Sequence, residues 1–327
     1  MHPPEFWTRN DLSGRAISAA LSPFGWLYGI SVAYKRDHAT PFRPRGKVVC
    51  VGNLTAGGSG KTPVAMALAR MLIARGARIA FLTRGYGGRS TGPVLVEWGK
   101  HSIGDVGDEP LLLAQIAPTI VASDRKAGAI LADAQGVDII VMDDGHQNFA
   151  IAKDLSMIVV DAETGFGNGR VLPAGPLREP VRQGLARADA VVPVGEGSPV
   201  LEGFRGPVLR ARLLPLTVPP LNTRIVAFAG IGRPAKFFSA LRAAGANLVE
   251  CHAFEDHHPY TRDEIVRLKA EASQARAVLM TTEKDFVRLN GRDGAGIQVL
   301  PIRALFDAPE EIERLLDKVS PRVEGPA

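Results

Sequence analysis

Short apolar runs recur along the chain and alternate with longer segments whose apolar residues have helical spacing. The runs in the first part of the chain lie at 47–51, 78–83, 137–142, 156–160 and 190–194. β-Branched runs that alternate with helical segments indicate parallel strands with helices on both faces of the sheet. The pattern therefore predicts an α/β fold with a doubly wound, mainly parallel sheet.

The segment 195–222 is rich in Gly and Pro and reads as a linker with short extended pieces. A second block of the same kind follows it, and we place the boundary between the two domains within this linker, at residue 217. Strands are then expected at 224–229, 246–250 and 277–282, and helices at 235–244 and 261–274. We therefore expect a second, smaller α/β domain. The predicted regions are an N-terminal segment at 1–36, a main domain at 37–216 and a C-terminal domain at 217–327.

The N-terminal region contains an uncharged segment at 16–34, with Arg15 before it and Lys35 and Arg36 after it. Its length is just enough to span a bilayer, but Pro23 and several Gly and Ser residues make it weakly hydrophobic. Aromatic residues typical of a membrane interface accompany it: Trp7, Phe24, Trp26, Tyr28 and Tyr34. We expect a helix, or a broken helix pair, in the headgroup region of a membrane. A helix buried against the main domain and a signal peptide are the alternatives.

The stretch 53–63 reads Asn-Leu-Thr-Ala-Gly-Gly-Ser-Gly-Lys-Thr-Pro and joins an expected strand to an expected helix. This context is typical of a P-loop, in which backbone N–H groups and a helix N-terminus hold phosphates. The fold is therefore expected to be P-loop NTPase-like, although Thr55 stands where the usual pattern has Gly. A plain glycine turn is the alternative. The predicted ATP-binding residues are Thr55, Ala56, Gly57, Gly58, Ser59, Gly60, Lys61 and Thr62.

Carboxylates follow the apolar run 137–142, which ends in Asp143 and Asp144. Mg²⁺ prefers hard oxygen ligands, and a P-loop site needs them beside the hydroxyl of Thr62. Glu179 follows a later strand in a turn-rich loop and is a further candidate ligand, next to Arg178, which is suited to neutralise a phosphate. Turn capping for the aspartates and a surface ion pair for Glu179 are the alternatives.

Asp108 precedes an apolar helical segment at 111–116. The spacing fits a helix cap and a base for a substrate hydroxyl equally well. Arg84 and Tyr86 lie in a second glycine-rich loop, which is expected either to recognise phosphate or sugar or to be simply flexible. Gln147 follows the two aspartates within reach of a bound substrate.

A polar cluster at 254–260 reads Phe-Glu-Asp-His-His-Pro-Tyr. On an extended segment His257 and His258 would point to opposite faces, so at most one would face a given site. An Asp-His pair that faces the main domain would orient or assist a base; helix capping by Asp256 or Thr261 is the alternative. Zinc binding is poorly supported, because no Cys or further His has suitable spacing. The segment 282–285 is also expected to face the cleft.

The bulk composition narrows the classes of partner. The chain has 327 residues, a formal net charge of +5 and two cysteines far apart in the sequence. Its Lys and Arg residues are scattered, and no nucleic-acid-binding module is recognisable, so anionic small substrates or a membrane surface are favoured. Two isolated cysteines suit a reduced cytoplasmic protein.

Taken in order, several of these motifs resemble the tetraacyldisaccharide 4'-kinase family of lipid A biosynthesis in Gram-negative bacteria. The resemblance covers nearly the whole chain. The family's P-loop also begins with a small hydroxyl residue, as Thr55 does here. The family commonly differs at the positions of His146 and Asn148, so no role is transferred to those two. The matching segments are 26–28, 51–63, 83–87, 107–110, 143–145, 172–179, 254–257 and 282–285.

The resemblance implies ATP- and Mg²⁺-dependent phosphorylation of a lipid A disaccharide precursor at the cytoplasmic face of the inner membrane. It implies Asp108 as the base, His257 as its support, and Lys61 for phosphates. It further implies a metal set of Thr62, Asp143, Asp144 and Glu179, and substrate contacts for Arg84 and Arg178. The smaller domain is expected to close over ATP, because His257 and Lys61 lie in different domains.

Two other functions share part of this pattern. A membrane-bound nucleotide switch would have the P-loop and the amphipathic segment without an acceptor. A kinase of a soluble sugar or coenzyme precursor would not need the aromatic N-terminus.

Overall fold

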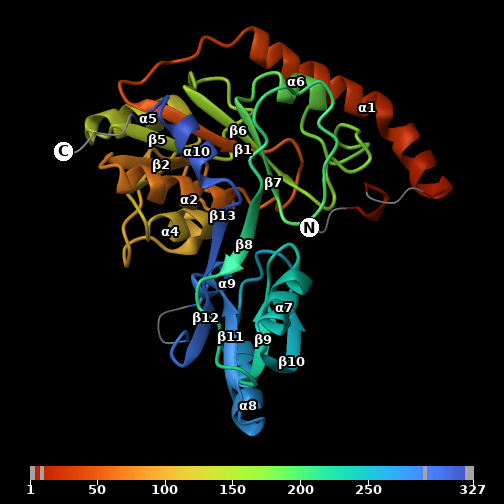
Figure 1. Cartoon of the computed structure of the whole chain (residues 1–327), viewed down its shortest axis with the longest axis vertical. Helices are drawn as coiled ribbons and strands as arrows, with labels where there is room; N and C mark the ends of the chain where they lie inside the picture. Colours follow the sequence, from red (N-terminus) through yellow and green to blue (C-terminus); the bar gives the residue numbers. More distant parts are fainter. Residues whose placement is uncertain (1–3, 8–10, 290–292, 321–327) are drawn as a thin grey trace.

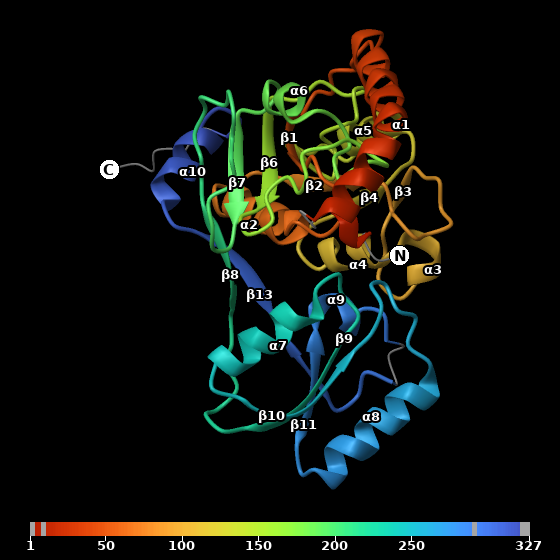
Figure 2. The same ribbon diagram turned by 90° about the vertical axis from the view of Figure 1, so that its right-hand side faces the viewer.

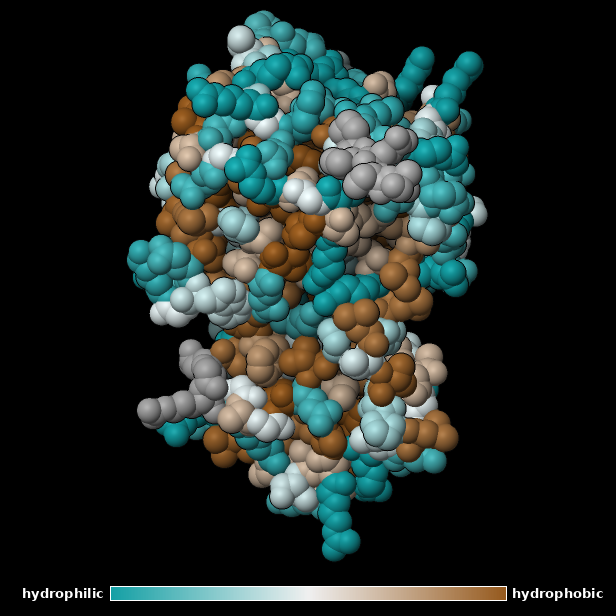
Figure 3. Space-filling model, turned by 60° about the vertical axis from the view of Figure 1, so that its left-hand side comes forward, coloured by the Kyte–Doolittle hydropathy of each residue, from teal (hydrophilic) through white to brown (hydrophobic). Residues whose placement is uncertain are grey.

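The structure, a computed structural model, describes residues 4–7, 11–289 and 293–320. Figures 1 and 2 show two lobes joined at a waist, and Figure 3 shows the surface narrowing there. We call them the larger lobe and the smaller lobe after the sheets on which they are built. Parts of the predicted regions 1–36 and 217–327 fall on 1–3, 8–10, 290–292 and 321–327, and these lie outside the described residues.

Within the described residues, the larger sheet contains nine strands in the order β13-β8-β7-β6-β1-β5-β2-β4-β3. Neighbouring strands are parallel, except that β3 is antiparallel to β4 and β13 is antiparallel to β8. This confirms the prediction of a mainly parallel sheet. The strands are β1 (Lys47–Gly52), β2 (Ile79–Thr83), β3 (Val94–Leu95), β4 (Thr119–Val121), β5 (Ile139–Asp143), β6 (Leu155–Asp161), β7 (Ala190–Val194), β8 (Ala211–Pro215) and β13 (Ile302–Phe306).

Helices cover both faces of this sheet. Val49 and Val51 of β1 join one core with α2, α4 and α10, whereas Val48 and Cys50 join the core under α5 on the opposite face. Such alternation along a strand buried on both sides is why the sequence shows a continuous apolar run. The helices are α2 (Lys61–Ala74), α3 (Ile103–Val106), α4 (Asp108–Leu113), α5 (Arg125–Ala134), α6 (Val181–Leu185) and α10 (Pro309–Leu316).

The smaller lobe has a parallel sheet in the order β10-β9-β11-β12. Phe237 and Leu241 of α7 pack on one face, and Ile265 and Leu268 of α8 pack on the other. Thr261 caps α8 in a capping box with Glu264, as the sequence allowed. The elements are β9 (Arg224–Ala229), α7 (Pro234–Ala243), β10 (Asn247–Ala253), α8 (Arg262–Gln274), β11 (Val278–Thr282), α9 (Glu283–Phe286) and β12 (Ile297–Leu300).

The chain crosses between the lobes twice. It leaves the larger lobe after β8 and returns through β13, which pairs with β8 from Ile302↔Pro215 to Phe306↔Ala211. Helix α10 then packs against the core that contains α2. Residues 302–320 therefore belong with the larger lobe, and the assignment of all of 217–327 to one C-terminal unit was wrong for this stretch. The second crossing was missed because strand pairing over such a separation leaves no local signal.

The N-terminal region forms the short 3-10 helix η1 (Glu5–Trp7) and one long helix, α1 (Leu12–Asp37), which continues through Pro23. Figure 1 shows α1 lying along the outside of the larger lobe, next to α6. Only 11% of its most apolar stretch is buried and the helix is continuous, so neither a buried helix nor a broken pair describes it. The helix is long and apolar enough to cross a membrane by length and composition.

Candidate active site

The P-loop lies between the central strand β1 and the helix α2, as predicted. Gly60 caps α2 with φ 85°, a left-handed conformation that favours glycine and turns the chain into the helix. Gly57 also has a positive φ of 114°, and the space beside both Gly57 and Gly58 is open. The loop therefore leaves backbone N–H groups and the N-terminus of α2 accessible to an anion.

A second segment braces the start of the P-loop. The backbone N–H of Ala56 donates to the Pro176 carbonyl over 2.7 Å, and that of Arg178 donates to the Leu54 carbonyl over 2.7 Å. Thr55 forms an isolated antiparallel bridge with Leu177. The turn-rich loop after β6 thus fixes the first residues of the P-loop, a relationship that the sequence did not reveal.

Thr62 and Asp143 meet at the end of β5. Thr62 Oγ1 donates to Asp143 Oδ2 over 2.9 Å, and Asp143 Oδ1 is buried without a hydrogen-bond partner among the described residues. Burial, together with the nearby carboxylate of Glu109, raises the pKa of the Asp143 carboxyl to about 7. An unpaired buried carboxylate oxygen beside a hydroxyl is a suitable donor set for a hard cation.

Asp144, the next residue, lies close to the P-loop lysine, Lys61. Its Oδ1 is 3.7 Å from Lys61 Nζ and accepts a hydrogen bond from Arg178 Nη1 over 2.8 Å. Burial raises the pKa of Asp144, but the positive charges of Lys61 and Arg178 outweigh it, so the pKa is lowered overall. Asp144 has φ 58°, a left-handed conformation that Asp tolerates better than most residues, at the turn after β5. The structure thus joins Lys61, Asp144 and Arg178 in one cluster.

Glu179 is neither a surface residue nor free to reach a metal. It is 1% exposed, and Arg187 Nη2 donates to both of its carboxylate oxygens over 2.7 and 2.8 Å. Gln147 Nε2 donates to Glu179 Oε1 over 3.0 Å and to the Asn53 carbonyl over 2.9 Å. These contacts indicate that Glu179 and Gln147 hold the loops around the P-loop. The ion pair that was the alternative for Glu179 is present, but it is buried and not on the surface.

Asp108 and His257 lie together at the contact between the lobes. His257 Nδ1 is 2.9 Å from Asp108 Oδ2, and Asp108 is 3% exposed at the first residue of α4. Helix α4 of the larger lobe packs against α9 of the smaller lobe (Figure 2). Arg288, just after α9, donates to the same Oδ2 through Nε over 2.8 Å and Nη2 over 2.5 Å.

The charges around Asp108 keep its carboxyl ionised. Burial raises the pKa of Asp108, but the hydrogen bond from His257 and the charges of Lys284 and Arg288 lower it well below its usual range. Lys284 Nζ is also 3.3 Å from His257 Nε2. Because an ionised Asp108 only accepts and Lys284 only donates, the proton of a neutral His257 lies on Nδ1.

Tyr86 places the second glycine-rich loop at this contact. Its ring centroid is 5.8 Å from that of His257, and its side chain is exposed. A side chain at Gly107 would collide with the Tyr86 carbonyl, so the loop packs directly on the residue before Asp108. Arg84 is exposed on the same loop and has no partner among the described residues. The loop is therefore positioned at the site and not simply flexible.

The histidines adjacent in sequence to site residues have structural roles. Burial lowers the pKa of His146 to about 3, and its ring nitrogens lie 3.1 Å from Ser156 Oγ and 3.1 Å from the Gly184 carbonyl. His258 contacts Glu264, 3.1 Å away, while His257 faces Asp108. The two histidines do face different partners, but the prediction of an extended segment was wrong, since His257 lies in a turn with φ 61°.

Sequence reasoning missed two basic residues at the site, Arg288 and Arg125. Arg288 and Lys284 contact the Asp108–His257 pair, although only the segment containing Lys284 was expected near the cleft. Arg125 is buried at the start of α5, and its Nε has no partner among the described residues. Burial lowers the pKa of its guanidinium group to about 10, and the negative charge of Asp144 opposes this shift. A charged residue that follows a strand at the start of a helix was the available signal for Arg125.

The P-loop and Asp143 lie at the carboxyl ends of the neighbouring parallel strands β1 and β5, and the residue before Asp108 packs on the loop that follows β2. Glu109, the residue after Asp108, is close enough to Asp143 to raise its pKa. Open α/β sheets bind ligands at this edge. The arrangement therefore places a phosphate-binding loop and a buried, ionised carboxylate in one site, which suits phosphoryl transfer to a hydroxyl group.

Comparisons with known proteins agree with this chemistry. The chain is 48% identical over 328 residues to the tetraacyldisaccharide 4'-kinase of Paramagnetospirillum magneticum, covering 98% of this chain and 100% of the relative. It is 46% identical to the enzyme of the same name from Maricaulis maris, covering 98% and 96%. Its fold is similar to the crystal structure of the "apo" form of LpxK from Aquifex aeolicus in complex with ATP, with a TM-score of 0.74, 26% identity, and coverage of 93% of this chain and 99% of that one.

The family model described as tetraacyldisaccharide-1-P 4'-kinase matches residues 17–320, which include most of α1, the P-loop, Asp108 and His257. With the P-loop geometry and the relatives at 48% and 46% identity, this match establishes that the chain belongs to the tetraacyldisaccharide-1-P 4'-kinase family.

Proposed function

We propose that the protein transfers the γ-phosphate of ATP to the 4'-hydroxyl of a tetraacylated glucosamine disaccharide 1-phosphate, at the cytoplasmic face of the inner membrane. The observation that carries this proposal is the buried Asp108 carboxylate, held ionised beside a P-loop. A sugar hydroxyl is a poor nucleophile until a base accepts its proton, and Asp108 is suited to that role. Lys61 and the N-terminus of α2 bind the phosphates.

His257 and the arginines have separate roles in this scheme. His257 donates to Asp108 Oδ2 through Nδ1 and so orients the carboxylate without touching the transferred group. Arg178 and Arg84 supply positive charge near the phosphates, Arg178 through its position beside Asp144 and Lys61. Tyr86 lies next to His257 and is suited to contact the sugar.

Mg²⁺ fits the residues at the end of β5. Thr62, Asp143 and Asp144 offer oxygen ligands, and the buried Asp143 Oδ1 lacks a partner among the described residues. When bound, the ion would neutralise phosphate charge in the transferred group. Glu179 is left out of this set, because its buried carboxylate is already paired with the charge of Arg187, and Gln147 also donates to it.

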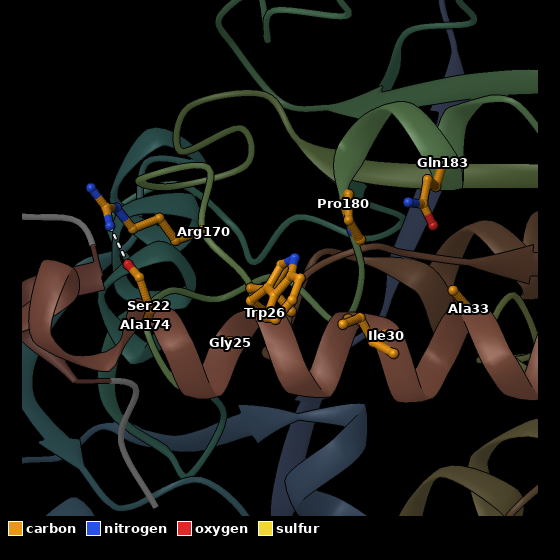
Figure 4. A pocket seen from close by; sticks show the side chains of 11 residues that line it. Ser22, Gly25, Trp26, Ile30, Ala33, Arg170, Ala174, Pro180 and Gln183 are labelled. Carbon is orange, nitrogen blue, oxygen red and sulfur yellow. Dashed lines mark hydrogen bonds between the residues drawn. The ribbon is translucent and has the colours of Figure 1, made fainter.

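Helix α1 supports delivery of an amphipathic acceptor. A groove of about 270 Å³ lies between α1 and the segment 170–183; Figure 4 shows Trp26 and Ile30 on one side of it and Arg170 and Pro180 on the other. The outer face of α1 is apolar and exposed, which suits the surface of a bilayer. Its exposed apolar residues are Leu12, Ile17, Phe24, Trp26, Leu27, Tyr28, Ile30 and Tyr34.

Nucleotide binding is further proposed to bring the smaller lobe closer to the P-loop, with bending at the β8–β13 ribbon. The contact between His257 and Asp108 would persist during this movement, because it already joins the lobes in this structure. Small-angle scattering with and without nucleotide and acceptor would measure the change, and an unchanged separation of the lobes would contradict it.

The direct test is a phosphate-transfer assay. Purified protein is incubated with γ-labelled ATP, Mg²⁺ and the disaccharide lipid, and the products are extracted with chloroform and methanol. Label in the lipid phase is expected. Label only in free phosphate would favour a nucleotide switch, and label in a water-soluble sugar would favour a soluble-substrate kinase.

Two variants calibrate this assay. Lys61→Met removes the phosphate-binding lysine and is expected to abolish transfer, whereas Lys47→Met changes an exposed lysine paired with Asp154 and should leave transfer unchanged.

Asp108→Asn should lower kcat by about 10²–10⁴ while ATP binding persists. Near-normal turnover of the Asp108 variant would refute its role as the base.

A further inference from the structure

Arg288 is held by the smaller lobe and reaches into the larger one. Its Nη1 donates to the Gly230 carbonyl over 2.6 Å and to Asp285 Oδ1 over 2.9 Å. Asp285 is itself fixed by the hydroxyl of Tyr260 over 3.0 Å and that of Thr282 over 2.6 Å. The guanidinium group is therefore oriented by its own lobe, and its remaining N–H groups point to Asp108.

The donors are distributed unequally between the two oxygens of Asp108. Oδ2 accepts from His257 Nδ1 and from Nε and Nη2 of Arg288. Oδ1 accepts from the backbone N–H of Glu109 over 2.9 Å, and no other donor reaches it among the described residues. One oxygen is thus saturated, while the other keeps a free lone pair.

Burial makes this arrangement necessary. The side chains of Asp108 and Arg288 are 3% and 4% exposed, and burial alone raises the pKa of Asp108. A protonated carboxyl group cannot accept a proton from a hydroxyl group. A cation fixed next to Oδ2 keeps the carboxylate ionised and leaves Oδ1 as the basic atom.

We propose that Arg288 is a positioning residue for the base: it binds Oδ2 of Asp108 from the smaller lobe and thereby presents an ionised Oδ1 to the acceptor hydroxyl. The inference rests on the proposed function, in which Asp108 is the base. It also makes the activity of the base depend on contact between the lobes, because Arg288 is held by Gly230 and Asp285 of the smaller lobe.

The rival interpretation is a salt bridge that only joins the lobes. Arg233 provides a matched control, because it also reaches from the smaller lobe to an aspartate of the larger one. Its Nη1 donates to Asp161 Oδ2 over 2.9 Å, and Lys236 donates to the same oxygen over 2.9 Å. Arg233→Met therefore removes a contact between the lobes without changing the surroundings of Asp108.

The first experiment is a double-mutant cycle on lipid phosphorylation. Arg288→Met is expected to lower kcat at least tenfold with little change in the KM for ATP, whereas Arg233→Met should stay within about twofold of wild type. In the Asp108→Asn background, adding Arg288→Met should cause less than about a twofold further loss, because no carboxylate remains to be positioned. A further tenfold loss in that background would overturn the inference.

The second experiment measures the dependence of kcat on pH. The charged and titratable groups near Asp108 are His257, Lys284, Arg288 and Glu109, with Asp256 and Asp285 beside the cations. Loss of the Arg288 charge is expected to move the acid limb of the profile toward neutral pH by about one unit or more. A role limited to joining the lobes would not move this limb, so an unchanged limb would count against the inference.

Arg288→Lys covers the case in which Arg288→Met does not fold. Lysine keeps one positive charge but loses the planar fork that binds Oδ2 through two N–H groups, so kcat is expected to fall below that of the wild type. Wild-type kcat in the lysine variant would contradict the inference. The two proposals fail separately: an active Asp108→Asn refutes the base assignment, whereas an inactive Asp108→Asn with a fully active Arg288→Lys refutes only the role of Arg288.

Discussion

His257 Nδ1 lies 2.9 Å from Asp108 Oδ2, although the two residues are 149 positions apart in the sequence and belong to different lobes. The contact joins the turn after β10 to the first residue of α4. Both lobes therefore contribute residues to the immediate surroundings of Asp108, the proposed base.

Asp108→Asn is expected to lower stability in a pH-dependent manner. Because the folded-state pKa of Asp108 lies well below its ordinary value, its ionised form stabilises the fold above that ordinary value, and this contribution is lost as the pH falls through the folded pKa. At pH 5–8 the variant should be less stable by about 3 kcal/mol, since Arg288 loses its charged partner. Urea unfolding at several pH values measures the difference. A difference that grows below pH 4 would contradict the prediction.

Asp143→Asn is expected to raise the Mg²⁺ concentration needed for half-maximal activity at least tenfold, because it removes a charged candidate ligand beside Thr62. Initial rates over a Mg²⁺ titration test this expectation. A variant with the Mg²⁺ requirement of the wild type would remove Asp143 from the metal set.

Glu179→Gln should change stability and not the metal requirement. Glu179 is buried and paired with Arg187, so the neutral variant is expected to lose about 2–3 kcal/mol of unfolding free energy. Its Mg²⁺ titration should match that of the wild type once folded protein is compared at equal concentration. A large shift in that titration would return Glu179 to the metal set.

Replacing Trp26 and Leu27 by Asp is expected to weaken binding to anionic lipid vesicles at least tenfold, because both apolar side chains are exposed on α1. Trp98 is the control: it is 53% exposed on a loop of the larger lobe, and Trp98→Asp should leave vesicle binding unchanged. Co-sedimentation measures both. Equal binding by all three proteins would show that α1 does not contact the membrane.

Gly25→Ala should loosen α1 from the larger lobe. A Cβ at Gly25 would lie 2.6 Å from the Val171 carbonyl oxygen, a backbone atom with little room to move, at an expected cost of about 1–3 kcal/mol. Gly29→Ala meets only Pro180 Cδ at 3.9 Å and should gain up to about 1 kcal/mol of helix stability. Faster proteolysis within α1 is expected for the first variant alone, and equal rates would contradict the prediction.

The sequence predicted those parts of the fold and site whose signals are local. A β-branched run, a glycine-rich turn and a helical segment place the P-loop between β1 and α2, and an apolar run ending in Asp143 places a carboxylate beside Thr62. For Asp108, spacing left a cap and a base equally possible, and its contacts with His257 and Arg288 are what distinguish its surroundings.

The remaining features depend on contacts between distant segments. Glu179 was a candidate metal ligand, with a surface ion pair as the alternative, yet it is buried and paired with Arg187, eight residues later. Arg288 follows a recognised segment, but its contact with Asp108 spans 180 residues and has no sequence period. Likewise, β13 reads as an ordinary late strand until its pairing with β8 is known.

Because β13 and α10 come late in the chain, the larger lobe cannot complete its fold until late in translation. Ile312, Leu315 and Leu316 of α10 lie in the same core as the helix that follows the P-loop, and β13 forms one edge of the larger sheet. A nascent chain that has emerged only as far as residue 216 therefore lacks part of the interior of its nucleotide-binding half. ATP-binding competence should consequently arise after translation of the final helix, and truncation before β13 should yield insoluble protein and not a minimal kinase.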